Sequence, residues 1–469
     1  MYPIIRYKDN TRKMTKILDY MKISYLSLLV LFFCMTLNCL AKAETKNMST
    51  KEYTLENGLK LIVQVDTRAP VVVSQVWYKV GSADEPLGLT GISHALEHMM
   101  FKGTPTVPGD GYSEQISKNG GNNNAFTTED FTAYYVELAA AKLNLSFQLE
   151  ADRMSNLSLK ADDFVQEKKV IMEERRMRTD DNPQHLTFER YMAAANIAGP
   201  YHHPVIGWMN DINNLTIEDL RAWYKKWYRP DNAILVVAGD VQPEAVFKLA
   251  KQYFGHIKNP PKNSKMKPLT EVASLGPKEV IVRVPAQLPY LIMGFDVPIY
   301  NTHAPLKFEP YALALLSYVL DGGESARFSK NLIRGKEIAA AASANYEPFK
   351  RYATQFNLSG IPKEGIQIKD LKTALWNEIN VLKKTRLSEK ELKKIKAQLI
   401  ASDIFQKDSM SNQATEIGEY ESVGLSWKDA HEFINRIQAI TAEQLQSVVN
   451  KYLIEDRVTV AILEPQAIK

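Results

Sequence analysis

Two stretches of the chain, one near the end of each half, can be laid over one another without a gap. The first begins at Leu215 and runs LTIEDLRAWYKKWYRPDNAILVVAG, and the second begins at Ile440 and runs ITAEQLQSVVNKYLIEDRVTVAILE. Each predicts a capped helix followed by a strand. Unrelated helix–strand units can look alike by chance, but here the cap, the helix face and the strand agree together, which indicates an internal duplication. The chain is therefore expected to fold as two homologous units.

The boundary between the two units is expected near Pro260 and Pro261, where a Lys-rich stretch interrupts the periodic patterns. This gives a first domain at 44–258, a linker at 259–274 and a second domain at 275–469. Strands are predicted at 60–65 and 71–80, and helices at 92–101, 139–154 and 162–178. Because strands and helices mix without strict alternation, the expected fold class is α+β, with each domain a sheet packed by helices.

The basic residues are concentrated at the front of the chain. Residues 1–43 hold seven of the 58 Lys and Arg and two of the 54 Asp and Glu, which leaves 51 basic against 52 acidic side chains in the remainder. A body this close to neutral argues against a nucleic acid partner.

Residues 1–43 have the features of a signal peptide. A continuous apolar run follows Lys22, and Ala41-Lys42-Ala43 is a small-residue cleavage signal, so cleavage is expected after Ala43. The alternative is an uncleaved membrane tether, since the run approaches the roughly 20 residues that span a bilayer. We expect a periplasmic or otherwise exported protein. Both cysteines of the chain lie in this leader, so we expect no disulfide or thiolate metal site in the mature domains.

The segment His94-Ala-Leu-Glu97-His98 places two of the eight histidines of the chain within five residues. On a helix, His94, Glu97 and His98 share the face opposite to the apolar residues, so both imidazoles can bind one metal ion with a carboxylate beside them. The alternative for such a histidine pair is a solvated polar face. The intervening glutamate makes the segment an inverted zinc motif, H-x-x-E-H.

A zinc site needs a third protein ligand, and an acidic residue on the apolar face of a helix is a candidate. In the helix predicted at 162–178, Phe164, Val170, Ile171 and Met177 define an apolar stripe, and Glu167 and Glu174 fall within it. An acid directed at a core is costly unless it meets a cation or a metal, so these two acids are the candidates. A salt bridge to an arginine of the first domain is the alternative.

With these motifs, the chain resembles the pitrilysin, insulysin and mitochondrial processing peptidase family of zinc metallopeptidases, as a bacterial half-length member. The family has its third ligand on a helix well downstream of the second histidine, at a spacing that falls on Glu174 here, and an important acid two helical turns earlier, at Glu167. Asn124-Ala125-Phe126-Thr127 is similar to an edge strand of the family, and the segments at 180–183 and 201–207 resemble two of its loops. The resemblance implies two homologous α/β-layered domains that form half of a clamshell.

The resemblance also implies zinc-dependent hydrolysis of peptides or unfolded proteins. One zinc ion per chain would be held by His94, His98 and Glu174, with Glu97 as the general base for an attacking water. Glu167 would orient a ligand, and the substrate would lie as an extended strand beside Asn124, Ala125 and Phe126. From the sequence alone, a plain turn into a half-buried strand is an equal alternative for that last segment.

The second unit carries no metal motif, because its helix at 311–320 contains no His or Glu. Arg327 resembles the arginine of an Arg/Tyr pair that the family uses to bind substrate, but Ile338-Ala339-Ala340 stands where the tyrosine is usual. We therefore expect a homodimer, or a heterodimer with a sister chain that supplies the pair. The alternative function is a non-catalytic peptide-binding or assembly subunit of the same fold.

Overall fold

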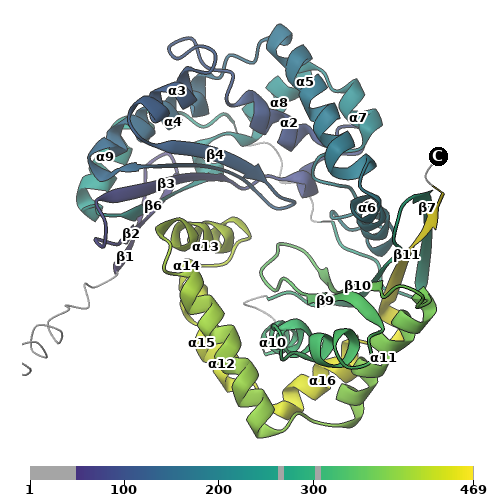
Figure 1. Ribbon diagram of the computed structural model, residues 1–469. Helices are drawn as coiled ribbons and strands as arrows, with labels where there is room; N and C mark the ends of the chain where they lie inside the picture. The colour runs from purple at the N-terminus through teal and green to yellow at the C-terminus, as the bar shows by residue number, and fades with distance from the viewer. Residues whose placement is uncertain (1–48, 262–268, 301–307, 468–469) are drawn as a thin grey trace, which may run out of the picture. The chain divides into compact units, whose positions relative to one another are not determined.

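The computed structural model describes residues 49–261, 269–300 and 308–467 (Figure 1). The leader predicted at 1–43 lies outside these residues, as do positions 262–268 of the predicted linker. The linker positions that are described, 259–261 and 269–274, have no regular secondary structure. Within the described residues, no helix is both long enough and apolar enough to span a membrane.

The first sheet has six strands in the order β1-β2-β6-β3-β5-β4. These are β1 (Ser49–Thr54), β2 (Lys60–Val65), β3 (Val71–Tyr78), β4 (Asn122–Thr127), β5 (Thr132–Ala139) and β6 (Ala233–Gly239). The pair β2 and β6 is parallel and the other neighbours are antiparallel. The segment that begins Asn122-Asn123-Asn124 is therefore an edge strand, paired on one side only.

The second sheet repeats this arrangement with five strands in the order β7-β11-β8-β10-β9. These are β7 (Lys278–Pro285), β8 (Tyr290–Val297), β9 (Ala339–Asn345), β10 (Thr354–Pro362) and β11 (Val458–Gln466). Its single parallel pair, β7 and β11, corresponds to β2 and β6. The predicted duplication is thus confirmed in the strand order and in the strand directions.

The repeated helix–strand unit also lies where the sequence places it. Helix α8 (Ile217–Trp227) and helix α16 (Ala442–Tyr452) are separated along the chain by the same interval as β6 and β11. Each helix begins with a capping box, in which Thr216 or Thr441 accepts a backbone N–H and the residue three positions on returns the bond. The α+β fold class is confirmed.

One face of each sheet is covered by helices from its own half of the chain. On the first sheet these include α2 (Ile92–Met99), α3 (Gly111–Lys118), α4 (Leu143–Asn156), α5 (Ala161–Arg175), α8 and α9 (Pro243–Phe254). On the second they include α10 (Glu309–Asp321), α11 (Ile368–Lys384), α12 (Glu389–Gln406), α15 (Phe433–Ala439) and α16. The helix predicted from residue 139 begins later, because Ala139 ends β5. The shorter helices α7 (Met209–Asn214) and α14 (Trp427–His431) lie in connections.

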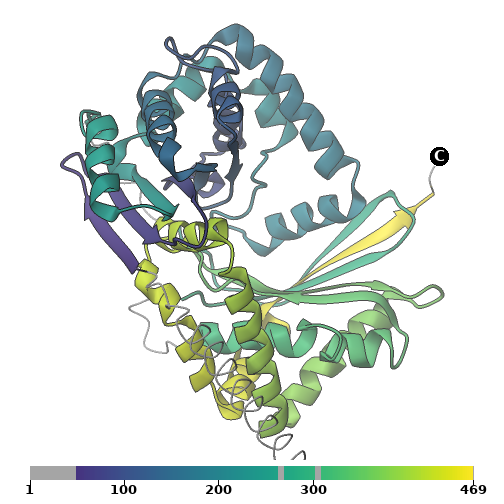
Figure 2. The same cartoon turned by 60° about the vertical axis from the view of Figure 1, so that its left-hand side comes forward.

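The opposite face of each sheet is covered by a helix from the other half (Figures 1 and 2). Helix α13 (Met410–Ser422) packs on β3 and β6, where Ala414 and Ile417 join Trp77 in one buried cluster. Helix α6 (Pro183–Ala195) packs on the second sheet, where Tyr191 and Ala195 meet Ile292 and Ala461. This exchange of helices binds the two halves together.

Both exchanged helices approach their sheet at a glycine. A Cβ atom on Gly418 of α13 would overlap the Trp77 ring, and one on Gly294 of β8 would overlap the Tyr191 hydroxyl, each at well under 3.0 Å. Contacts this short do not occur, so a side chain at either position would push helix and sheet apart.

We predict that Gly418→Val lowers the free energy of unfolding by about 1–3 kcal/mol or more, because the added side chain overpacks the contact with Trp77. Urea denaturation followed by circular dichroism measures the change. Gly111→Ala is the control, since a Cβ there meets only the tip of the Val107 side chain at 3.1 Å. Equal stability of the two variants would contradict the close packing of α13.

Candidate metal centre

Helix α2 presents two chemically different faces, as its sequence predicts. Ile92, Leu96 and Met99 are fully buried in the first core. His94, Glu97 and His98 project from the other side, with His94 9% exposed and the other two partly buried. The packing of the apolar face therefore fixes the direction in which the three polar side chains point.

The start of α2 is held by the carboxyl group of a residue outside the helix. Glu85 accepts hydrogen bonds from the backbone N–H groups of Gly91 and Ser93, at 2.7 and 2.8 Å. Gly91 has a left-handed backbone (φ 88°), and a Cβ there would lie 2.5 Å from the carbonyl oxygen of Ile206. Burial raises the pKa of Glu85 to about 8, while its two backbone donors act in the opposite direction. The glycine permits this backbone conformation, and Glu85 accepts the first N–H groups of the helix.

Helix α5 brings the two predicted acids to α2. Phe164 and Ile171 are buried, and Glu167 and Glu174 lie half-buried on the same side. Val170 and Met177 are 50% and 68% exposed, so their assignment to the apolar stripe is wrong. For Met177 the reason is that α5 ends at Arg175, and the next five residues form a π-helical turn that shifts the side-chain directions.

His94, His98 and Glu174 converge on one point. Within the described residues they form the single group of three or more potential metal ligands found, with one ligand atom from each within 4.8 Å of the others. Glu174 Oε2 lies 3.6 Å from His94 Nε2 and 3.3 Å from His98 Nε2. The structure thus brings together the three residues that the sequence predicts as ligands.

These spacings fit a zinc ion. Ligand atoms at about 2.0–2.2 Å from a tetrahedral zinc lie about 3.3–3.6 Å from one another, which matches the two distances to Glu174. Two imidazoles and one carboxylate leave a fourth position open, as in catalytic zinc sites. The donor set therefore suits zinc in both chemistry and size.

The protonation of two members of the group suits a metal, whereas at His98 the effect of burial is outweighed by the hydrogen bonds with Glu174 and Glu167, which raise the pKa of that ring. Burial, with a smaller contribution from the neighbouring His98, lowers the pKa of His94 to about 4, so this ring is neutral. The hydrogen bond with His98 is the main cause of a lowered pKa at Glu174. Neutral imidazole and ionised carboxylate are the forms that bind metal ions.

Glu97 lies beside this group without belonging to it. Its carboxylate oxygen Oε2 accepts a 2.5 Å hydrogen bond from Thr127 Oγ1, at the end of β4. Burial raises the pKa of Glu97, and the Thr127 bond opposes that shift. Glu97 is thus an acid next to the three ligand atoms, and one of its oxygens is held in place.

A cavity of about 470 Å³ contains the group and reaches the edge strand. Its lining includes Glu97 together with Asn124, Ala125 and Phe126 of β4, as the sequence predicts. Arg327 does not line it. That arginine follows α10 and forms a 3.1 Å ion pair with Glu391 of α12, within the second half.

Several lining residues were not predicted from the sequence. Three of them lie in segments that resemble the family, namely Thr127, Val205 and Ile206. No pattern in the sequence assigns these three residues a role. Arg178 and Thr179 come from the π-helical turn, and Arg178 Nη1 contacts Glu174 Oε1 at 2.7 Å. No pattern in the sequence predicts this π-helical turn.

Nearby histidines outside the motif take no part in the group. His203 is buried rather than solvated, and its Nδ1 lies 3.9 Å from Glu85 Oε2. Neither His202 nor His203 lines the cavity described above.

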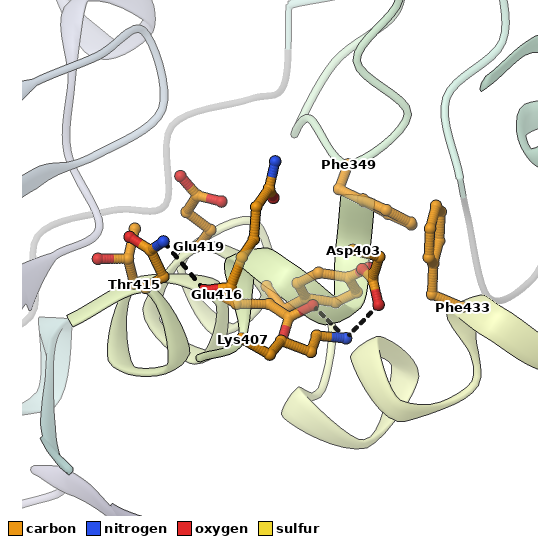
Figure 3. A pocket seen from close by; sticks show the side chains of 10 residues that line it. Phe349, Asp403, Lys407, Thr415, Glu416, Glu419 and Phe433 are labelled. Carbon is orange, nitrogen blue, oxygen red and sulfur yellow. Dashed lines mark hydrogen bonds and ion pairs between the residues drawn. The ribbon is translucent and has the colours of Figure 1, made fainter. Parts of the chain in front are cut away.

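A second cavity, of about 480 Å³, lies in the second half between α12, α13 and the segment after β9 (Figure 3). Its aromatic walls include Phe349 and Phe433, and Lys407 forms ion pairs with Asp403 and Glu416. It contains no histidine and shares no residue with the first cavity. It is a separate feature of the second half.

Comparison with known proteins places the chain among peptidases. A family model described as insulinase (peptidase family M16) matches residues 60–207, and one described as the peptidase M16 inactive domain matches residues 214–399. The chain is 30% identical to the zinc protease PqqE of Helicobacter pylori over 92% of its own length and 96% of that protein. It is 24% identical to the uncharacterized zinc protease YmxG of Bacillus subtilis, over 88% and 98% of the two chains.

A solved structure agrees with these matches. The crystal structure of a protease from Helicobacter pylori superposes with a TM-score of 0.85 at 29% identity, covering 89% of this chain and all of that one. The chain belongs to peptidase family M16, the insulinase family. Both of these relatives carry the name zinc protease.

We predict that Glu85→Ala lowers the free energy of unfolding by about 1–3 kcal/mol or more, because it leaves two buried N–H groups at the start of α2 without an acceptor. Thermal denaturation of the metal-free protein measures this. Glu56→Ala is the matched control, since the Glu56 side chain is 88% exposed. If both variants unfold alike, Glu85 does not hold the helix.

Proposed function

We propose that the chain is a zinc-dependent endopeptidase. The observation that carries this proposal is the convergence of His94 Nε2, His98 Nε2 and Glu174 Oε2 beside a fourth residue, Glu97, that is not a ligand. An acid next to an open metal position is the arrangement needed to activate a water. The names of the relatives support the same assignment.

The residues of the chain have distinct tasks in this proposal. Zinc, when bound, supplies an open coordination position and a positive charge that lowers the pKa of a water and polarises the scissile carbonyl. Glu97 accepts the proton of the attacking water and passes it to the leaving amine. Thr127 holds Glu97 Oε2 and so leaves Oε1 to face the water. Glu167 forms a hydrogen bond with the Nδ1 atom of His98 and so orients that ring.

The substrate binds along β4 in this proposal. This strand is the last in the order of its sheet, so the backbone groups on its outer side have no partner strand among the described residues and can pair with an extended peptide. The Ala125 N–H, which donates to the Asn124 side chain, would exchange that partner for the peptide. Asn124, Ala125 and Phe126 line the same cavity as Glu97 and the ligands. Backbone pairing of this kind tolerates many side chains, which suits hydrolysis of peptides and unfolded proteins.

We predict that Glu97→Gln abolishes peptide cleavage while one zinc ion per chain is retained. The expected fall in kcat is at least about 10²–10⁴-fold, because the substitution removes the general base but no ligand. Hydrolysis of a long, unstructured, fluorescence-quenched peptide by residues 44–469 gives the rate. Metal analysis of the same samples gives the zinc content.

His98→Ala is the companion variant, and it should lose both zinc and cleavage. Removal of zinc with a chelator should stop the wild-type reaction, and added zinc should restore it. A Glu97→Gln protein that cleaves at the wild-type rate would contradict the proposal and favour a non-catalytic peptide-binding or assembly subunit.

We further propose that the chain is exported, as a periplasmic protein or one tethered through residues 1–43, and that it works as a homodimer or with a sister chain. Arg327 supports the second point, because it is paired with Glu391 and does not line the cavity that holds Glu97. A partner would then supply the Arg/Tyr pair that binds substrate.

Dilution tests this second proposal. If the protein works as a homodimer, the rate of peptide cleavage per chain should fall when purified residues 44–469 are diluted until the dimer dissociates. If the partner is a different chain, the rate should stay low at every concentration and rise only when that chain is added. Light scattering on the same samples gives the mass. A monomer whose rate per chain is high and independent of concentration would contradict the need for a partner.

A further inference from the structure

Glu167 is held at both of its carboxylate oxygens. Its Oε2 atom lies 3.1 Å from His98 Nδ1, and its Oε1 atom lies 2.6 Å from the ammonium nitrogen of Lys102. Each oxygen therefore has its own charged or polar partner. A carboxylate fixed at both oxygens cannot rotate away from the histidine.

Lys102 is well placed to act on the ligand histidine. It lies just beyond the end of α2, where its backbone N–H bonds to the carbonyl of Met99, and its side chain crosses to α5. In the part of the chain that the structure describes, it is the one Lys or Arg recorded in an ion pair with Glu167. The pair is partly shielded from water, since the two side chains are 30% and 13% exposed.

His98 and His94 differ in the hydrogen bonding of their Nδ1 atoms. The Nδ1 atom of His94 is buried and has no hydrogen-bond partner, so no carboxylate orients that ring. For His98, Glu167 can accept a hydrogen bond from Nδ1, so that Nε2, the ring nitrogen facing Glu174 and the metal position, is the one that would bind a metal ion. The Lys102–Glu167 pair thus acts on the one histidine ligand whose ring is held by hydrogen bonding.

The other acid of the site has a similar but weaker partner. Arg178 contacts Glu174 Oε1 and leaves Oε2 to face the two histidines. Its side chain is 73% exposed, so solvent screens this pair strongly. Of the two cations, Lys102 is the one whose removal should matter more.

We propose that Lys102 is a positioning residue of the metal site: its ammonium group fixes Glu167, and through Glu167 it orients His98 as a ligand. This rests on the proposed zinc site, and it adds a residue outside the H-x-x-E-H motif and outside the set of acids. The consequence is a higher zinc affinity without direct contact between Lys102 and the metal.

The test is the zinc dissociation constant of metal-free residues 44–469, measured by competition with a chromogenic chelator. Lys102→Met keeps the aliphatic stem and removes the charge, and it should raise the dissociation constant about 10–100-fold, the range typical of lost outer-shell partners. Lys102→Arg keeps a cation within reach of Glu167 and should recover most of the affinity. Glu167→Gln should weaken binding at least as much as Lys102→Met.

Arg176→Met is the matched control, because Arg176 forms an exposed ion pair with Glu173 next to the same helix and touches no site acid. The melting temperature of the metal-free protein should be alike for Lys102→Met and this control. The proposal is overturned if Lys102→Met binds zinc as tightly as Arg176→Met, or if its loss of affinity follows a fall in metal-free stability.

The outcome is separate from that of the proposed function. Because the dissociation constant needs no turnover, a wild-type chain that binds zinc but cleaves no peptide would contradict the endopeptidase and still give a clear result for Lys102. A wild-type chain that binds no zinc would overturn both.

Discussion

Both sheets carry apolar side chains on their two faces. The half of the chain that forms a sheet places most of its own helices on only one of these faces. On the first sheet, Trp77 and its neighbours on the second face are covered by α13, and on the second sheet Ile292 and Ala461 are covered by α6. Burying each large apolar side chain contributes about 1.5–3 kcal/mol, so leaving these faces open would be costly. The exchange of one helix in each direction satisfies both sheets at once.

The candidate metal centre is connected to this exchange. Helix α5 carries Glu167 and Glu174, and the π-helical turn that follows it leads directly into α6, which lies on the second sheet. Arg175 anchors the junction, since its guanidinium bonds to Glu189 of α6 and to the carbonyl of Gly207. The direction of α5 is thus set partly by the second half of the chain, although that half contributes no ligand among the described residues.

Much of the site could be predicted from one sequence, because its chemistry conflicts with its local pattern. Glu167 and Glu174 fall on the side of their helix that carries the buried Phe164 and Ile171, and two histidines on one face of a short helix are the other candidate ligands. The repeat also predicts the second domain, since cap, helix and strand agree along its whole length.

The features that could not be predicted depend on departures from regular helical geometry or on contacts between elements. The sequence pattern places Val170 and Met177 in the buried stripe, but both side chains are half or more exposed. For Met177, a π-helical turn ends the regular helical period on which that pattern relies. Glu85, Thr127 and Lys102 act through contacts between elements distant in sequence or through turn geometry, which no periodic pattern encodes. The exchange of α6 and α13 likewise depends on tertiary packing, because the local sequence of a helix does not specify which of two sheets it covers.

The most direct test of the account is X-ray diffraction from zinc-loaded crystals of residues 44–469, with anomalous data collected at the zinc absorption edge. The account predicts one strong peak per chain, at about 2.0–2.2 Å from His94 Nε2, His98 Nε2 and Glu174 Oε2, with Glu97 outside bonding distance. A peak at another group of residues, or none at all in a protein that cleaves peptides, would contradict it.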